Sequence, residues 1–453
     1  MAVRFGTDGV RGLANVEVTP EVALALGRAA SRVLGAGASH ARVVVGVDSR
    51  RSGALLAAAL SAGMASEGLD VIDLGIVPTP AVALAAQRDH VVGAMISASH
   101  NPFADNGIKF FAPGGAKLPD ATEAHIELEL DRILGGAVAS GSPRIGADVG
   151  RIVGDPGFIE TYVEHVAGAL EGRRLQGLRV VLDTANGATS EAAPAVFRAL
   201  GADVIVIHNT PDGTNINDAC GSTHPESLQE SVRAHEAHAG FAFDGDADRM
   251  LAVDANGTVV DGDQILAMLA VDRRARSRLA HDTVVVTVMT NLGFRIAMAE
   301  QGVTVVDTAV GDRYVLEAMV AGGFVLGGEQ SGHVINADIA TTGDGTLSAV
   351  LVADLLVRSG RSLAALGTVM TRLPQVLRNV TGVDRGRLET AEELWADVRA
   401  AEAELAGRGR VLLRPSGTEA LVRVMVEAPT HDMAIATASR LCQTVERVLG
   451  PAT

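Results

Sequence analysis

The feature that most constrains the fold is an alternation of short Val- and Ile-rich runs with longer Ala- and Leu-rich stretches, which occurs three times. Short apolar runs are typical of buried strands, and the longer stretches are typical of helices. We expect strands at 42–48, 71–75, 91–96, 178–183, 203–208, 240–243, 283–288, 303–307 and 324–326, and helices at 52–67, 80–87, 191–200, 226–237, 293–301 and 313–320. Strands that alternate with helices predict parallel or mixed sheets covered on both faces.

The last 80 or so residues have a different pattern. An acidic helix at 388–405, strands near 411–413 and 421–426, and a closing helix at 432–449 indicate a smaller α+β unit. A chain of 453 residues also exceeds a single core. We therefore expect an α/β protein of four domains around a central cleft, three of them similar mixed α/β sheet domains. The predicted boundaries are 1–155, 156–259, 260–372 and 373–453.

The charge and the cysteines limit the class of partner. A net charge of −16 argues against nucleic acid or an anionic membrane, so an anionic substrate must meet a locally positive site. The two cysteines, Cys220 and Cys442, have no metal-type or redox-type spacing, which suits a reducing compartment. Charged residues occur too close to the N-terminus for a signal peptide. No apolar run approaches the ~18 residues that a membrane-spanning helix needs. We expect a cytoplasmic protein.

The first motif with chemistry follows the expected strand at 91–96. It holds two hydroxyls (Ser97 and Ser99), the imidazole of His100 and the amine of Lys109, with turns expected at 101–102 and 106–107. Ligands of open α/β sheets bind at the carboxyl ends of strands. Only two of the 38 Lys and Arg residues are Lys, at 109 and 117. Lys can shuttle a proton if its pKa is lowered, whereas Arg cannot, so position 109 is a candidate for acid–base chemistry.

The second motif is acidic, and it follows the expected strand at 240–243. Asp244, Asp246 and Asp248 alternate along the chain and are followed by Arg249. In an extended segment these three carboxylates share one side. They then repel each other unless a cation lies between them, and hard oxygen ligands select Mg²⁺ or Ca²⁺. The alternative is an acidic surface turn whose Asp residues cap the backbone.

Three further stretches combine glycines with polar side chains. Residues 414–419 (RPSGTE) combine a guanidinium, two hydroxyls and backbone amides left free by the glycine, a set of donors typical of a phosphate-binding loop. Arg423 lies close downstream. Residues 327–333 (GGEQSGH) offer Glu329 and Ser331 for sugar hydroxyls and His333 for acid–base work. Residues 5–12 (FGTDGVRG) carry Arg11 between glycines. Taken alone, each stretch is also typical of an ordinary turn. A single histidine more often has a structural role than a catalytic one.

Taken together, these motifs resemble the α-D-phosphohexomutase superfamily over essentially the whole chain. The resemblance rests on the order of FGTDGVRG, SASHNP, DGDADR, GEQSGH and RPSGTE. Gln330 and the TAVGDR stretch at 308–313 favour the branch that acts on glucosamine phosphates. The family's known reaction therefore becomes the expectation for this chain, namely interconversion of glucosamine 6-phosphate and glucosamine 1-phosphate through a sugar 1,6-bisphosphate, for amino-sugar nucleotide and cell-wall synthesis.

The resemblance also implies roles for individual residues. Ser99 is carried as phosphoserine, and one Mg²⁺ per chain is held by its phosphate and the three aspartates. Arg11 and Arg249 neutralise charge. Lys109 is the first candidate for proton transfer and His333 the second, and His100 also belongs to the catalytic group. Glu329 and Ser331 grip the sugar. The phosphate that does not react is held by Arg414, Ser416, Gly417, Thr418 and Arg423.

Three alternatives stay open at this point. A phosphomannomutase or phosphoglucomutase of the same superfamily is the nearest one. A serine hydrolase using Ser99 and His100 is disfavoured because neighbouring residues of an extended segment point to opposite faces and no G-x-S-x-G motif surrounds Ser99. A sensor that binds a sugar phosphate without turnover is the third. The sequence also leaves open whether the protein is a homodimer.

Overall fold

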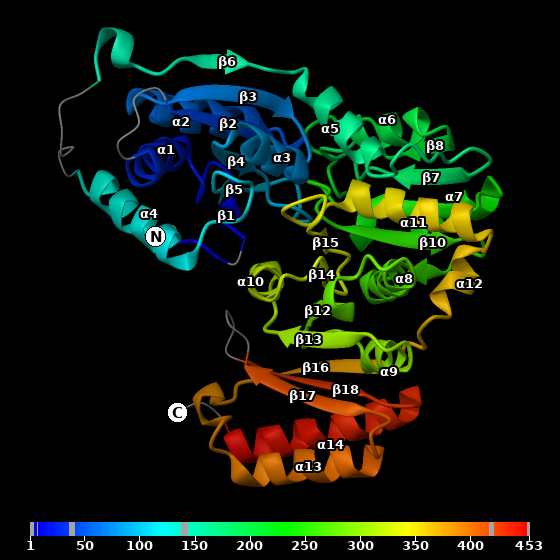
Figure 1. Cartoon of the computed structure of the whole chain (residues 1–453). Coiled ribbons are helices and arrows are strands. Elements are labelled where there is room, and N and C mark those ends of the chain that lie inside the picture. Colours follow the sequence, from blue (N-terminus) through cyan, green and yellow to red (C-terminus); the bar gives the residue numbers. More distant parts are fainter. Residues whose placement is uncertain (1–3, 7, 36–40, 137–143, 416–420, 451–453) are drawn as a thin grey trace. The chain divides into compact units, whose positions relative to one another are not determined.

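The computed structural model describes residues 4–6, 8–35, 41–136, 144–415 and 421–450 (Figure 1). Contacts divide the chain into two compact units. The N-terminal unit consists of residues 1–289 and 302–369, and the C-terminal unit of residues 290–301 and 370–453. The three expected α/β segments contribute their sheets to the N-terminal unit.

The first sheet has six strands in the order β1-β5-β4-β2-β3-β6. They are β1 (Val10–Leu13), β2 (Arg42–Val47), β3 (Asp70–Ile76), β4 (Val92–Ile96), β5 (Asp105–Phe111) and β6 (Ile152–Gly154). The helices of this part are α1 (Pro20–Leu34), α2 (Gly53–Ser66), α3 (Thr79–Asp89) and α4 (Asp120–Leu134).

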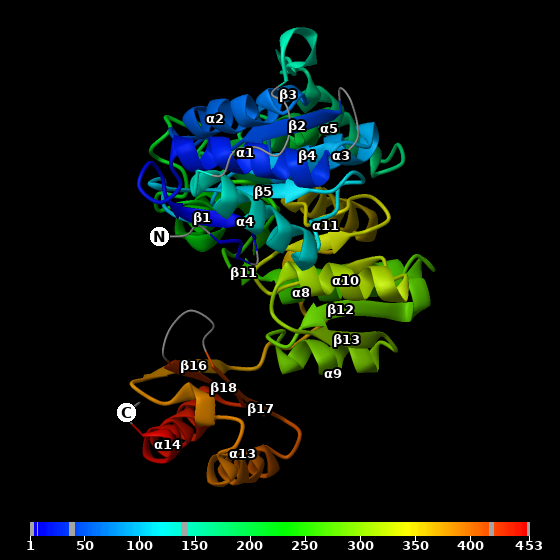
Figure 2. The same cartoon turned by 90° about the vertical axis from the view of Figure 1, so that its left-hand side faces the viewer.

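Helices α1 and α2 lie side by side (Figure 2). Two glycines allow this close approach, since a Cβ at Gly27 of α1 would stand 2.3 Å from the Leu60 carbonyl oxygen. On the facing helix, a Cβ at Gly63 would stand 2.2 Å from the Leu24 oxygen. Any side chain at either position would therefore push the two helices apart.

The second sheet has the order β11-β10-β9-β7-β8. Its strands are β7 (Arg179–Asp183), β8 (Asp203–Ile207), β9 (Ala239–Phe243), β10 (Met250–Asp254) and β11 (Val259–Val260). Helices α5 (Phe158–Gly168), α6 (Ala192–Ala199) and α7 (Glu226–Ala234) belong to this part. The third sheet, β13-β12-β14-β15, comprises β12 (Thr283–Thr287), β13 (Thr304–Thr308), β14 (Leu326–Gly328) and β15 (Val334–Asn336). The same stretch of chain contains α8 (Gly262–Ala275), α10 (Asp312–Gly322), α11 (Gly345–Ser359) and α12 (Leu363–Gly367), of which α11 and α12 also contact β10 of the second sheet.

The three sheets share one arrangement. In each, a strand parallel to its neighbour β2, β7 or β12 is followed by a loop and a return strand that pairs with it antiparallel. These pairs are β4 and β5, β9 and β10, and β14 and β15. The predicted fold class, with three similar mixed α/β sheets, is confirmed. The return strands were not predicted; β5 begins with Asp105-Asn106-Gly107, which is typical of a turn, and β15 has only three residues.

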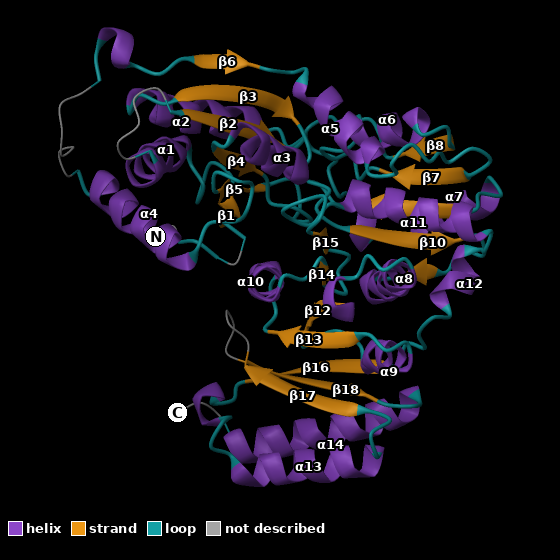
Figure 3. Ribbon diagram, in the orientation of Figure 1, coloured by secondary structure: helices purple, strands orange, loops and turns teal. Residues whose placement is uncertain are grey.

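The C-terminal unit contains an antiparallel sheet in the order β16-β18-β17, with β16 (Gln375–Thr381), β17 (Arg410–Pro415) and β18 (Leu421–Glu427). Helices α13 (Glu392–Leu405) and α14 (His431–Leu449) cover one face of it (Figure 3). Contacts place α9 (Leu292–Glu300) in the same unit. Short 3₁₀ helices lie at Gly146–Asp148, Gly221–Thr223, Ala280–Asp282 and Arg385–Arg387. The smaller C-terminal domain is confirmed.

One predicted turn is wrong. Asn106 and Gly107 lie inside β5, where they pair with Gly12 and Arg11 of β1. Gly107 is required by a close approach rather than a turn, because a Cβ there would stand 2.7 Å from the carbonyl oxygens of Ser97 and Val10. Within the described ranges, no helix is both long and apolar enough to cross a membrane.

The start of α11 yields a prediction on stability. Asp344 caps this helix, since one carboxylate oxygen accepts from the Leu347 amide at 2.8 Å and from the Tyr162 hydroxyl at 2.9 Å. Burial raises the pKa of Asp344 to about 6. A folded-state pKa above the unfolded value stabilises the fold at low pH, and this contribution is lost as the pH rises through about 6.

We expect Asp344→Asn, which keeps an oxygen acceptor but does not titrate, to remove this loss. Between about pH 5 and about pH 7.5, the free energy of unfolding of the wild type should fall by about 1 kcal/mol relative to the variant. Urea unfolding of both proteins across this range measures the difference. A difference that stays constant with pH would contradict the assignment.

Candidate active site

Ser99 lies on the loop that joins β4 to β5, where the backbone is unusual. Its φ is +52°, in the left-handed region that residues other than glycine rarely adopt. Its amide donates to Ser97 Oγ at 2.9 Å, and Ser97 Oγ in turn donates to Asp48 at 2.6 Å. Ser99 is buried, and its own hydroxyl donates to Asp244 at 2.6 Å. The loop therefore aims this hydroxyl at the acidic motif of the second sheet.

The three aspartates lie on the loop that joins β9 to β10, and all are buried. They offer carboxylate oxygens within 4.8 Å of one another. The prediction that they share one side of an extended segment is wrong. The segment is a turn, in which the Ala247 amide donates to the Asp244 carbonyl at 3.0 Å and Ala247 has a φ of +56°. The turn folds the motif back on itself, so the carboxylates converge without an extended backbone.

This cluster fits a hard divalent cation. Burial, together with the neighbours Asp248 and Asp246, raises the pKa of Asp244 well above its usual value. Among the described residues, Oδ1 of Asp246 and Oδ1 of Asp248 have no hydrogen-bond partner although both atoms are buried. Buried carboxylate oxygens without donors are costly, and oxygen-only donor sets suit Mg²⁺. The predicted metal ligands are therefore brought together with Ser99.

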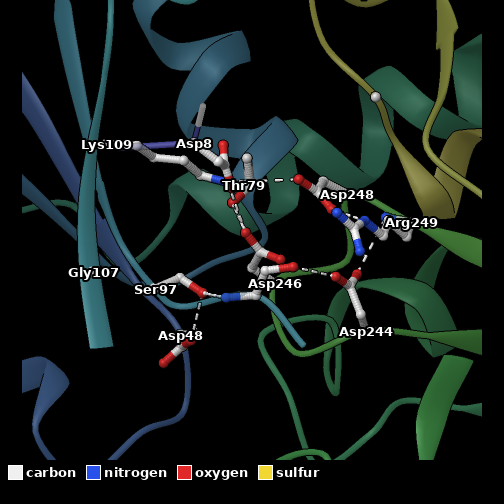
Figure 4. A network of polar contacts seen from close by, with 12 residues as sticks. Asp8, Asp48, Thr79, Ser97, Gly107, Lys109, Asp244, Asp246, Asp248 and Arg249 are labelled. Atoms are coloured by element: carbon white, nitrogen blue, oxygen red, sulfur yellow. Dashed lines mark hydrogen bonds and ion pairs between the residues drawn. The ribbon is translucent and has the colours of Figure 1, made fainter. Parts of the chain in front are cut away.

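Lys109 lies against the acidic motif (Figure 4). Its ammonium is 2.9 Å from Asp246, 3.6 Å from Asp248 and 3.6 Å from Asp8. The Thr79 hydroxyl donates to the same oxygen of Asp246 at 2.6 Å. Burial alone would lower the pKa of Lys109, but the three carboxylates raise it above its ordinary value. Lys109 is thus held as a cation.

The second lysine of the chain lies in the same network. Lys117 Nζ is 2.6 Å from Asp8 and 2.5 Å from Asp312, at the start of α10. His333 lies 3.5 Å from Asp312 and 3.6 Å from Asp248. Acidic and basic side chains thus alternate in a closed ring of six, hereafter the charge ring, in the order Asp248, Lys109, Asp8, Lys117, Asp312 and His333. The ring joins residues from the segments that form all three sheets of the N-terminal unit.

His100 is adjacent to the reactive hydroxyl. Its Nδ1 is 3.4 Å from Ser99 Oγ and 3.1 Å from Arg249 Nη1. The expectation that these neighbouring side chains point to opposite faces is wrong, because the left-handed backbone at Ser99 turns both toward the same side. Burial, Arg249 and Arg11 lower the pKa of His100. A neutral imidazole whose Nδ1 accepts from Arg249 carries its proton on Nε2.

The remaining predicted residues are more dispersed. Arg11 donates to Asp8, and the Arg249 amide donates to Asp244 at 3.2 Å. Glu329 lies in the tight turn between β14 and β15 and accepts from the Gly311 amide at 3.2 Å, while Ser331 is exposed in the same turn.

In the C-terminal unit, Arg414 of β17 is directly opposite Arg423 of β18. Burial and Arg423 lower the pKa of Arg414. Ser416, Gly417 and Thr418 lie outside the described residues. Two guanidinium groups side by side repel unless an anion lies between them. The two positive charges therefore lie next to each other in this sheet.

Three residues of the charge ring were not assigned from the sequence: Asp8, Lys117 and Asp312. Asp8 stands inside the FGTDGVRG motif, and Asp312 stands inside TAVGDR. The rarity of Lys singles out Lys117 as well as Lys109. Motif position or residue type therefore singled out all three residues in the sequence. Only the fold shows that their side chains contact one another.

Four models for domains of the family described as phosphoglucomutase/phosphomannomutase match the chain. The α/β/α domain I matches residues 2–134, domain II residues 160–257, domain III residues 261–373 and the C-terminal domain residues 377–443. The chain belongs to the phosphoglucomutase/phosphomannomutase family. The family predicted from the motifs is thereby confirmed.

Within this family, the chain is similar to phosphoglucosamine mutases. It is 56% identical to the phosphoglucosamine mutase of Frankia alni over 98% of both chains. It is 54% identical to that of Thermobifida fusca over 97% of both chains. Identity of this level over the full length indicates a mutase, which is an isomerase.

Solved structures of the family share the fold. A phosphoglucomutase/phosphomannomutase family protein from Burkholderia thailandensis matches with a TM-score of 0.82 at 24% identity, covering 100% of this chain and 99% of that one. The N-acetylphosphoglucosamine mutase of Aspergillus fumigatus, in complex with GlcNAc-6P and magnesium, matches with a TM-score of 0.71 at 18% identity, covering 99% and 96%.

The electrostatics of the aspartates lead to a second prediction. Asp244→Asn removes the carboxylate whose charge burial and its neighbours disfavour most. In EDTA we expect the variant to unfold at a temperature no lower than the wild type. Saturating Mg²⁺ should stabilise the wild type, by about 2.7 kcal/mol at a hundredfold excess over the dissociation constant, and the variant much less.

Thermal unfolding with and without Mg²⁺ measures both effects. Asp218→Asn, at an exposed loop position, is the matched control and should respond to Mg²⁺ like the wild type. Equal stabilisation of the wild type and Asp244→Asn by Mg²⁺ would exclude the aspartate cluster as the metal site.

Proposed function

We propose that this protein is a phosphoglucosamine mutase that interconverts glucosamine 6-phosphate and glucosamine 1-phosphate. The observation that carries the proposal is the 2.6 Å contact between the Ser99 hydroxyl and Asp244, inside a cluster of three buried aspartates. The identity of 52–56% to phosphoglucosamine mutases supports the substrate class. The hydroxyl stores a phosphoryl group, gives it to one end of the sugar and recovers a phosphoryl group from the other end, with a sugar 1,6-bisphosphate between the two transfers.

Asp244, Asp246 and Asp248 would hold one Mg²⁺ beside the phosphate of Ser99. When bound, the ion offsets the charge of the transferred group. The protein's own cations add to this effect. Lys109 stays protonated because carboxylates surround it, so we assign it to charge neutralisation rather than to proton abstraction. Arg11 and Arg249 have the same role.

Proton transfer falls to the imidazoles. When a sugar hydroxyl attacks the phosphoserine, the bond between phosphorus and Ser99 Oγ breaks, the bond to the sugar oxygen forms, and the sugar proton must leave. The Nδ1 atom of neutral His100 carries no proton and lies 3.4 Å from Ser99 Oγ, so it is placed to accept the sugar proton and then pass it to the leaving serine oxygen. His333 is the alternative, although its contact with Asp248 raises its pKa against the effect of burial.

Binding of the sugar phosphate involves other residues. We assign Glu329 and Ser331 to the sugar hydroxyls, and Arg414 and Arg423, with residues 416–418, to the phosphate that does not react. We also propose that the chain has four domains, with boundaries at 1–155, 156–259, 260–372 and 373–453. These contacts do not depend on which of the two phosphates reacts. The bisphosphate could therefore bind in either of two orientations.

Ser99→Ala tests the proposed nucleophile. We expect the rate of turnover to fall by about 10⁴-fold or more, because the acceptor oxygen is absent, while the protein still folds and binds substrate. Coupled assay of mutase activity and calorimetry of substrate binding measure the two effects.

Intact mass completes this test. Incubation with glucose 1,6-bisphosphate should add one phosphoryl group to the wild type and to the control Ser66→Ala, at the end of α2, but none to Ser99→Ala. Near-normal turnover by Ser99→Ala would overturn the proposal. A wild type that binds the sugar phosphate without turnover would instead be a sensor.

Substrate preference separates the proposal from a phosphomannomutase or phosphoglucomutase. We expect kcat/KM for glucosamine 1-phosphate to exceed that for glucose 1-phosphate and mannose 1-phosphate by at least about tenfold, since one polar contact is worth about that factor. Parallel initial-rate measurements on the three substrates decide it. A higher kcat/KM on mannose or glucose phosphate would reassign the enzyme within the family.

A further inference from the structure

Arg50 lies just after β2, and its side chain is completely buried next to the loop that carries Ser99. A guanidinium has five N–H donors in a fixed planar arrangement. All five are used. Nε donates to Asp48 at 2.9 Å. The other four donate to main-chain carbonyl oxygens of the loop and of the first residue of β5, those of Ser99 (2.8 Å), Asn101 (2.8 Å), Pro102 and, in β5, Asp105 (3.1 Å).

Asn217 of the second sheet's part reinforces this clamp. Its side-chain amide donates to the carbonyl oxygens of Ser99 at 2.9 Å and Asn101 at 3.1 Å. The Ser99 carbonyl thus receives one bond from Arg50 and one from Asn217. The loop has little room to shift, because a Cβ at Gly245 would stand 2.6 Å from the same Ser99 oxygen. The position of the Ser99 carbonyl is therefore determined from three directions.

The amide side of Ser99 is tied to the same arginine. Asp48 Oδ2 accepts both from Arg50 Nε and from Ser97 Oγ, and Ser97 Oγ accepts from the Ser99 amide. Both peptide groups that flank Ser99 are thus connected to Arg50. A left-handed backbone at a residue other than glycine costs on the order of 1 kcal/mol and persists only where its surroundings impose it. The clamp supplies that constraint at Ser99.

We propose that Arg50 is a positioning residue that sets the direction of Ser99 Oγ toward the aspartate cluster without touching the substrate. The proposal rests on the proposed function, in which Ser99 carries the phosphoryl group. A misplacement of about 1 Å at a reacting atom costs about 100-fold in rate. Lys keeps the charge of Arg50 but has three donors instead of five, so it cannot hold four carbonyls and Asp48 together.

The experiment compares Arg50→Lys with Arg51→Lys, the same change at the exposed neighbouring position. For each full-length protein, we would measure kcat and KM for glucosamine 1-phosphate, the rate at which glucose 1,6-bisphosphate phosphorylates Ser99, and the unfolding temperature. We expect Arg50→Lys to lose about 100-fold in kcat and in the phosphorylation rate, with KM changed by less than about threefold. Arg51→Lys should match the wild type.

Asn217→Gly provides a second variant that spares the arginine. Its φ of +58° suits glycine, so the backbone stays unstrained while both side-chain bonds to the loop are lost. We expect a smaller fall in kcat, of about tenfold, again with KM nearly unchanged. This variant decides the question if Arg50→Lys does not fold.

The outcomes separate the two proposals. If the wild type is phosphorylated on Ser99 and Arg50→Lys is phosphorylated at the same rate, the role of Arg50 is overturned and the proposed function stands. A rise in KM that matches the fall in kcat/KM would also overturn it, because it would indicate lost substrate binding. If the wild type is never phosphorylated on Ser99, the proposed function fails, and with it the role of Arg50.

Discussion

The site depends on the pairing of buried opposite charges. Taking a carboxylate out of water costs several kcal/mol unless a cation compensates it. Here the buried or half-buried carboxylates of two loops and of the first residue of α10 share two lysines and a histidine in the charge ring, and Asp8 contacts both lysines. Since the ring takes members from all three sheets of the N-terminal unit, the pairing stabilises the packing of these sheets as well as the site.

The three sheets share one backbone arrangement, and its loop carries different functional groups in each sheet. In each sheet a loop follows a parallel strand and leads into an antiparallel return strand. The first loop carries the hydroxyl of Ser99, the second the aspartate cluster, and the third Glu329 and His333. The charge ring and the contact between Ser99 and Asp244 join these loops, so chemistry that no single sheet contains is assembled from three similar parts.

Much of this could be predicted, and the errors share a cause. The parallel strands and most helices follow from local apolar patterns, and the aspartates and Ser99 follow from motif chemistry. The extended form of the acidic motif, the turn at 106–107 and the opposed faces of Ser99 and His100 were wrong. Positive φ at Ser99 and Ala247, and a glycine kept for close packing at position 107, decided these points. Backbone conformation of this kind is imposed by neighbours distant in sequence, and no local pattern reports it.

The sequence by itself determined the fold class and the residue types of the site, because strand periodicity, motif order and the choice of Lys at two positions are local properties. Only the tertiary structure decided which groups meet. Ser99 and Asp244 are 145 residues apart, and Lys109 and Asp246 are 137 apart. The protonation of Lys109, the neutrality of His100 and the clamp of Arg50 all follow from such contacts, since charge and hydrogen bonding depend on distance in space rather than along the chain.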